Sequence, residues 1–133
     1  VLCSMRSLLW TIILSILLSS ALLAQGKNPP HNGQLKRAGY YNVEVVDCSG
    51  YLEIYIYDME MNPLRNYGLS GMVDFHYPDS TCASSKLYHY GVDGFTAEPE
   101  RQLYASCEVF IRGQGTNIRA VFKDIVCVRP DEQ

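Results

Sequence analysis

The fold is decided by one stretch of sequence, YYNVEVVDCSGYLEIYIY at residues 40–57. Apolar side chains recur at every second position in both halves of this stretch, which is typical of strands with one buried face and not of helices. Asp47 and Gly50 lie at the break between the halves and suit a tight connection. We therefore predict a β-hairpin over residues 40–57.

The same alternation continues toward the C-terminus. Residues 71–77 are predicted as a strand, with a turn at Pro78 and a return strand at 86–90. Residues 103–112 and 117–128 form a third pair around Gly113-Gln114-Gly115, with a bulge near Asp124. About seven short strands without a helical stripe predict an all-β fold, an antiparallel and immunoglobulin-like β-sandwich.

The first segment has the features of a secretory signal peptide. Arg6 precedes an uncharged and mainly apolar run from Leu8 to Leu23, which is shorter than the roughly 20 residues of a membrane span. Small residues near its end favour cleavage after Ala24. We predict a signal peptide at 1–24, a polar leader at 25–36 and a β-sandwich domain at 37–129, with an uncleaved N-terminal anchor as the alternative.

The net charge of the chain and its expected location limit the classes of molecule that it could bind. The chain has a formal net charge of −3 with both signs interspersed, and no basic stripe that would suit a phosphate backbone. We expect no nucleic-acid partner, and no membrane association after signal cleavage. The expected location is periplasmic or secreted.

Four cysteines follow the predicted cleavage site: Cys48, Cys82, Cys107 and Cys127. In an oxidising compartment an even number of cysteines favours disulfides, and four cysteines allow three different pairings. The spacing chooses none of them. Free thiols or metal ligands are the alternative.

The motifs of common enzyme classes are absent from the sequence. There is no Gly-x-Ser-x-Gly, no His-Glu-x-x-His and no glycine-rich phosphate loop, and His31, His76 and His89 stand in no catalytic motif. We therefore predict that the protein is not an enzyme.

One candidate metal site comes from the predicted hairpin over 71–90. If its turn is symmetric, His76 lies opposite His89, and cross-strand neighbours are close enough for two imidazoles to share an ion. Asp74 would project from the same face. The alternative is that both histidines are ordinary surface residues of a sheet.

A second candidate site lies around the first hairpin. His31 precedes Glu44 in the first strand, and Met59 and Met61 follow the second strand. Imidazole and thioether ligands together suit copper, in particular Cu(I). The alternative for Met59 and Met61 is that they pack over the end of the sandwich.

Two stretches also resemble a known group of proteins. Residues 30–46, PHNGQLKRAGYYNVEVV, and residues 52–58, LEIYIYD, resemble small exported β-sandwich domains of the Bacteroidota type, which occur with periplasmic adaptor proteins of heavy-metal efflux pumps. That group has a Pro-His-Gly-Gly opening and a Tyr-His-Ile-Glu strand. His31 and Glu44 match it, whereas Asn32 and Asn42 stand where that group has a glycine of its opening and its strand histidine. The resemblance implies a periplasmic role in handling copper or another metal, with an efflux component as partner.

Two functional hypotheses follow. The first is a non-enzymatic exported protein that binds a transition metal, with copper as the cofactor, as an accessory to efflux or resistance. The second is a disulfide-stapled extracellular module that binds a protein or a glycan through a tyrosine-rich sheet surface, since ten tyrosines are many for this length. Tyrosine is also a preferred strand residue, so the count alone does not separate the two.

Overall fold

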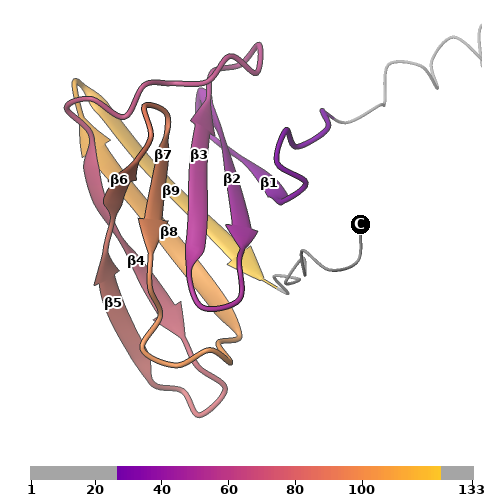
Figure 1. Ribbon diagram of the computed structural model, residues 1–133, viewed down its shortest axis with the longest axis vertical. Helices are drawn as coiled ribbons and strands as arrows, with labels where there is room; N and C mark the ends of the chain where they lie inside the picture. The colour runs from indigo at the N-terminus through magenta and orange to yellow at the C-terminus, as the bar shows by residue number, and fades with distance from the viewer. Residues whose placement is uncertain (1–26, 124–133) are drawn as a thin grey trace, which may run out of the picture.

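The computed structural model describes residues 27–123 as two antiparallel β-sheets that pack face to face (Figure 1). Their orders are β1-β2-β3-β7-β6 and β5-β4-β8-β9. The strands are β1 (Gln34–Ala38), β2 (Tyr41–Asp47), β3 (Leu52–Tyr57), β4 (Ser70–His76), β5 (Cys82–Lys86), β6 (Tyr88–Tyr90), β7 (Gly94–Ala97), β8 (Ser106–Gly113) and β9 (Thr116–Lys123). The predicted signal peptide, the start of the leader and the bulge near Asp124 lie outside the described residues.

The strand order is that of an immunoglobulin-like sandwich. Strands β2, β3, β7 and β6 occupy the positions A, B, E and D of one sheet, and β4, β8 and β9 occupy C, F and G of the other. Strand β5 extends the second sheet at the position of C′, and β1 adds a strand beside A. The predicted fold class is therefore confirmed, with nine strands in residues 27–123 instead of about seven.

The additional strands are those with weak sequence patterns. Strand β1 begins at Gln34, inside the segment 25–36 that we expected to be a leader, and its sequence QLKRA has little apolar alternation. The predicted return strand at 86–90 is divided, because β5 ends at Lys86 in one sheet and β6 begins at Tyr88 in the other. Leu87 lies at the crossing with its side chain buried, and its N–H donates to the Gly71 carbonyl. The chain passes from the four-stranded to the five-stranded sheet at this point, because the Leu87 side chain packs in the core between them.

The two strongest hairpin predictions are confirmed. Strand β2 pairs with β3 so that Val43 lies opposite Ile56. Their turn contains Ser49 and Gly50 at positive φ, and the Asp47 carboxylate accepts a hydrogen bond from the Ser49 N–H. Strand β8 likewise pairs with β9 around residues 113–116.

The inner faces of the sheets form one apolar core. Side chains from both sheets alternate into it, as the period of two predicts. Its largest fully buried members are Phe75, Phe95, Phe122, Leu52, Ile54, Ile56, Ile111 and Ile118. Cys107 is also fully buried there.

The outer faces of the two sheets differ. Strand β2 is buried on both faces, because a small second cluster of Val46, Tyr55 and Tyr57 forms outside the five-stranded sheet and is covered by Leu35, Cys48 and Met61. The outer side chains of β4, β5, β8 and β9 are exposed or half-buried. Within residues 27–123, no helix has the length and apolar character needed to cross a membrane.

Candidate functional site

The segment that precedes β1 lies on the outer face of the five-stranded sheet. It turns at Asn32, which has φ +58°, and the Asn32 N–H donates to the Pro29 carbonyl. Gly33 then approaches β2 so closely that a Cβ on it would lie 2.4 Å from the Val45 carbonyl oxygen. Only glycine fits at this contact, and the Asn-Gly pair therefore positions His31 over the sheet.

Glu44 holds this segment in place. Its carboxylate is fully buried, and Oε1 accepts hydrogen bonds of 2.9 Å from the backbone N–H groups of both His31 and Gly33. The other oxygen, Oε2, accepts the Tyr57 hydroxyl at 2.8 Å and lies 3.2 Å from His31 Nδ1. A buried charge requires partners of this kind, so Glu44 acts as an internal anchor for the N-terminal segment.

Two tyrosines complete the anchor. The His31 ring stacks on Tyr55 with centroids 3.7 Å apart, and His31 Nδ1 lies 2.9 Å from the Tyr57 hydroxyl. Burial, followed by the hydrogen bond to Glu44, raises the pKa of Tyr57 above its ordinary value. Burial and the hydrogen bond to Glu53 raise the pKa of Tyr55 in the same way. Both phenols therefore stay protonated and serve as hydrogen-bond donors.

The structure thus brings His31 and Glu44 together, as predicted, but in a network of internal hydrogen bonds. Met61 packs against the second cluster near Tyr55 and Tyr57. The Met59 sulfur accepts a hydrogen bond from the Arg37 guanidinium at 3.4 Å. A metal ion at Glu44 would have to replace hydrogen bonds that already hold the fold.

The geometry therefore shows no preformed copper site at His31, Glu44, Met59 and Met61. In the part of the chain that the structure describes, no three side chains of His, Cys, Asp or Glu are grouped so as to hold a metal ion. Binding of copper at His31, Glu44, Met59 and Met61 stays a prediction.

The expected pairing of His76 with His89 is wrong. His76 of β4 pairs with Cys82 of β5, whereas His89 lies on β6 in the other sheet and pairs with Phe95. The His89 Nε2 lies 2.8 Å from the Leu69 carbonyl oxygen, so this ring has a structural hydrogen bond. The pairing fails because the return strand divides at Leu87, which shifts the assumed register and separates the two histidines. Asp74 remains on the same strand as His76 and receives a hydrogen bond from Ser84.

The described cysteines occupy three different environments. Cys48 is half-buried in the β2–β3 turn, Cys82 is exposed on β5, and Cys107 is buried on β8. Burial, with a smaller contribution from the Asp47 carboxylate, raises the pKa of the Cys107 thiol to about 12. No disulfide joins any two of these three residues, and Cys127 lies outside the described residues.

The exposed tyrosines come from several elements of the fold. Tyr40, Tyr51 and Tyr67 lie in the connections that follow β1, β2 and β3, whereas Tyr88 and Tyr90 lie on the edge strand β6. Only the last two share a strand. Binding of a protein or glycan through a tyrosine-rich sheet surface stays a prediction.

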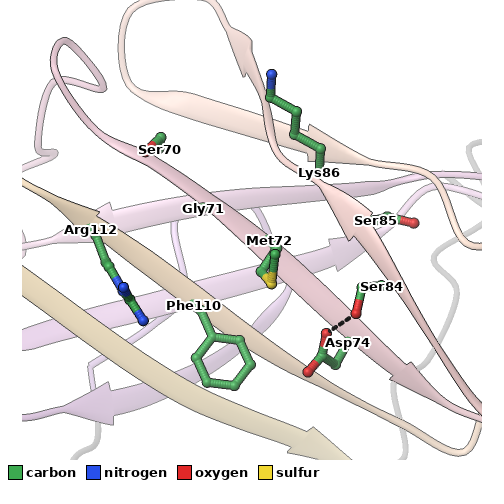
Figure 2. A pocket seen from close by; sticks show the side chains of 9 residues that line it. All are labelled: Ser70, Gly71, Met72, Asp74, Ser84, Ser85, Lys86, Phe110 and Arg112. Carbon is green, nitrogen blue, oxygen red and sulfur yellow. Dashed lines mark hydrogen bonds between the residues drawn. The ribbon is translucent and has the colours of Figure 1, made fainter.

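A groove lies instead on the outer face of the four-stranded sheet. It has a volume of about 640 Å³ and is lined by Ser70, Gly71, Met72, Asp74, Ser84, Ser85, Lys86, Phe110 and Arg112 (Figure 2). Met72 of β4 is 47% exposed and directly faces Phe110 of β8 across the strand pair. The two apolar side chains form the floor of the groove, and no segment of residues 27–123 other than β4, β5 and β8 is among its lining.

Basic groups flank this apolar floor. Figure 2 shows Lys86 and Arg112 on different sides of Met72, with Asp74 bonded to Ser84. Arg119 forms an ion pair with Glu108 on the same face of the sheet. The groove lining thus has two basic side chains, Lys86 and Arg112, and one acidic side chain, Asp74.

The pattern analysis did not single out this groove. A signal was present, because Met72 and Phe110 are large apolar residues in the outward phase of their strands. Their meeting depends on the β4–β8 pairing, which joins strands separated by 29 residues of chain and was not predicted. Comparisons of this chain with family models, with curated proteins and with solved structures find no match.

Proposed function

We propose that the chain is a non-enzymatic exported module that binds a segment of a partner protein on the outer face of its four-stranded sheet. The observation that supports this function best is the exposed Met72 beside the half-buried Phe110, in a groove with Lys86 and Arg112 at its sides. The immunoglobulin-like framework supplies a rigid surface on which these side chains are fixed by strand pairing.

The residue types in the groove favour a protein partner. Aromatic residues, Met and Arg are enriched at protein interfaces, and Phe110, Met72 and Arg112 supply one of each. An apolar side chain of a partner would displace water from between Met72 and Phe110. At about 25 cal/mol per Å² of apolar area removed from water, such burial contributes part of the binding free energy of a micromolar complex.

Charge indicates which partner segment fits. Lys86 and Arg112 flank the apolar floor, whereas Asp74 already accepts Ser84 and Glu108 pairs with Arg119. A partner with carboxylates on either side of an apolar side chain would therefore complement the groove. A long phosphate backbone is a poorer fit, because the chain as a whole carries a net charge of −3.

The groove offers little to support catalysis. Its only described hydroxyl–carboxylate contact joins Ser84 to Asp74, and no histidine lines it. A nucleophile with a base and a stabilised oxyanion position would be needed for acyl transfer. These features favour binding over chemistry.

A titration with two defined peptides tests the proposal. One twelve-residue Gly/Ser peptide carries a central Phe flanked by Glu residues, and its control carries Lys in place of Glu. We expect the acidic peptide to shift the amide NMR signals of Met72 and Phe110 in the ¹⁵N-labelled protein. R112E is expected to weaken binding about tenfold because a carboxylate contact becomes a repulsion.

Lys36→Glu is the matched control variant. Lys36 is exposed on β1, in the other sheet, so the same change of charge there should leave the affinity unaltered. The proposal fails if the basic peptide binds equally well, or if the shifts map to the His31 side of the molecule.

A further inference from the structure

Asn32-Gly33, in the turn that leads into β1, is the only Asn-Gly pair of the sequence. An asparagine side chain deamidates fastest when glycine follows it, because a residue without a Cβ lets its backbone nitrogen approach the side-chain amide. Asn32 is exposed, and its φ of +58° lies in the left-handed region. The pair therefore has the residue types and the solvent access that deamidation requires.

Deamidation of this pair proceeds through an imide and needs only water. The Gly33 backbone nitrogen loses its proton and bonds to the Asn32 side-chain carbonyl carbon, and the amide nitrogen leaves that carbon as ammonia, which carries the proton away. A water molecule then opens the ring at either of its carbonyl carbons, to aspartate or to isoaspartate. No electrons are exchanged with another molecule, so no oxidant or reductant is involved.

The Glu44 anchor opposes the first of these steps. The Gly33 N–H donates a hydrogen bond of 2.9 Å to Glu44 Oε1, and the Glu44 side chain is fully buried. An imide nitrogen carries no proton, so ring closure removes this donor from a buried carboxylate, which is costly. The nearby negative charge also disfavours loss of the Gly33 amide proton. The nucleophile of the reaction is thus held by the fold.

Close packing against β2 restrains Gly33 in addition. A Cβ on Gly33 would lie 2.4 Å from the Val45 carbonyl oxygen and 2.8 Å from Val46 Cγ2. Such contacts leave little room for the rotation that brings the Gly33 nitrogen toward the Asn32 side chain. The N-terminal segment, residues 27–33, therefore has to leave the sheet before the imide can form.

An isoaspartate at position 32 would not fit the anchor again. The His31 and Gly33 N–H groups both donate to the same oxygen, Glu44 Oε1, at 2.9 Å. The isoaspartyl linkage runs through the former side chain, so it adds a backbone carbon between these two donors. It also adds a negative charge to the turn that packs on the buried Glu44 carboxylate, where like charges repel strongly. Opening followed by deamidation is therefore irreversible.

We infer that Asn32-Gly33 is a modification site that the Glu44 anchor keeps closed. Opening of the N-terminal segment exposes the pair to deamidation, and deamidation then keeps the segment open. The His31 ring would leave the face of Tyr55, on which it stacks with centroids 3.7 Å apart. The outer face of the five-stranded sheet is uncovered as a result.

A deamidation time course tests the role of the fold. The full wild-type chain and the free peptide PPHNGQLK, residues 29–36, are incubated at neutral pH and analysed by mass spectrometry, with chromatographic separation of the aspartyl and isoaspartyl products. We expect Asn32 in the protein to react at least about tenfold more slowly than in the peptide, because only the opened population reacts. Equal rates would overturn the inference.

Two variants separate the anchor from global stability. Glu44→Ala removes the acceptor of the Gly33 N–H and should raise the deamidation rate to within about threefold of the free peptide. Ile118→Ala, in the core on β9 of the other sheet, also destabilises the fold but leaves the anchor intact, so its rate should stay near that of the wild type. A rate for Glu44→Ala no higher than that for Ile118→Ala would contradict a specific role of Glu44.

Hydrogen exchange of the wild type supplies a measurement that needs no variant. The Gly33 amide proton exchanges only when its bond to Glu44 Oε1 opens, and the same opening frees the Gly33 nitrogen for imide formation. The factor by which the fold slows exchange at Gly33, measured by NMR, should therefore match the factor by which it slows deamidation, within about threefold. A larger mismatch would show that a different opening controls the reaction, and the anchor would not be its gate.

Discussion

The outer faces of the two sheets have similar strand patterns but differ in whether the protein's own chain covers them. On the five-stranded sheet, Glu44, Tyr55 and Tyr57 point outward and are nevertheless buried, because the segment before β1 covers them. On the four-stranded sheet, Met72 and Phe110 also point outward, and they line an uncovered groove. The covered face has a carboxylate that anchors its own chain, whereas the open face has basic groups over which no segment of residues 27–123 is held in this way.

This difference separates internal anchoring from external binding. A buried carboxylate with four hydrogen-bond contacts contributes to stability and has little capacity left for a ligand. A large apolar side chain that remains exposed, such as Met72, contributes little to stability and is available to a partner. The most conspicuous polar cluster of the sequence therefore belongs to the fold, and a less conspicuous pair of residues carries the proposed function.

The largest expected effect is a difference in alkylation rate between the Cys82 thiol on the open face and the Cys107 thiol in the core beneath it. In iodoacetamide at pH 8, native Cys107 should be alkylated about a thousand times more slowly than an ordinary thiol, because its pKa of about 12 leaves little thiolate. Cys82, which is exposed on β5, should react rapidly. A time course followed by mass spectrometry measures both rates. Equal rates would show that β8 opens readily and that the groove is not rigid.

A second prediction concerns the anchor of the covered face. Glu44→Ala should lower the free energy of unfolding by about 3 kcal/mol, because the donors from His31, Gly33 and Tyr57 lose their acceptor. Urea denaturation measures the loss. Glu60→Ala, at an exposed position in the β3–β4 connection, should change it by no more than about 0.5 kcal/mol. Similar values for the two variants would remove the distinction between the faces.

The smallest expected effect on stability comes from Asp79, whose carboxylate is exposed, whereas that of Glu44 is buried. Hydrogen bonds from Thr81 and then from Arg101 lower the pKa of Asp79 to about 2 in the β4–β5 turn. Since the unfolded value is about 3.9, this contribution is present above about pH 4 and is lost as the pH falls toward 2. Asp79→Asn should slightly flatten the acid limb of a plot of Tm against pH. A variant with the wild-type acid limb would show that the contact adds nothing in solution.

Much of the framework could be predicted from local patterns. The β2–β3 and β8–β9 hairpins follow from alternation and turn residues, because their partners are adjacent in the chain. The proximity of His31 and Glu44 was also predicted, although their role as an internal anchor was not. The divided strand at Leu87 was missed, since nothing in the residues 86–90 indicates to which sheet each of them belongs.

The sequence by itself determined that alternating side chains would build antiparallel sheets, because the period of two is a local property of an extended backbone. Only the tertiary structure decided which outward side chains are covered. Pairing between distant strands placed Met72 beside Phe110 and removed His89 from His76. These outcomes depend on long-range packing, which a local pattern does not encode.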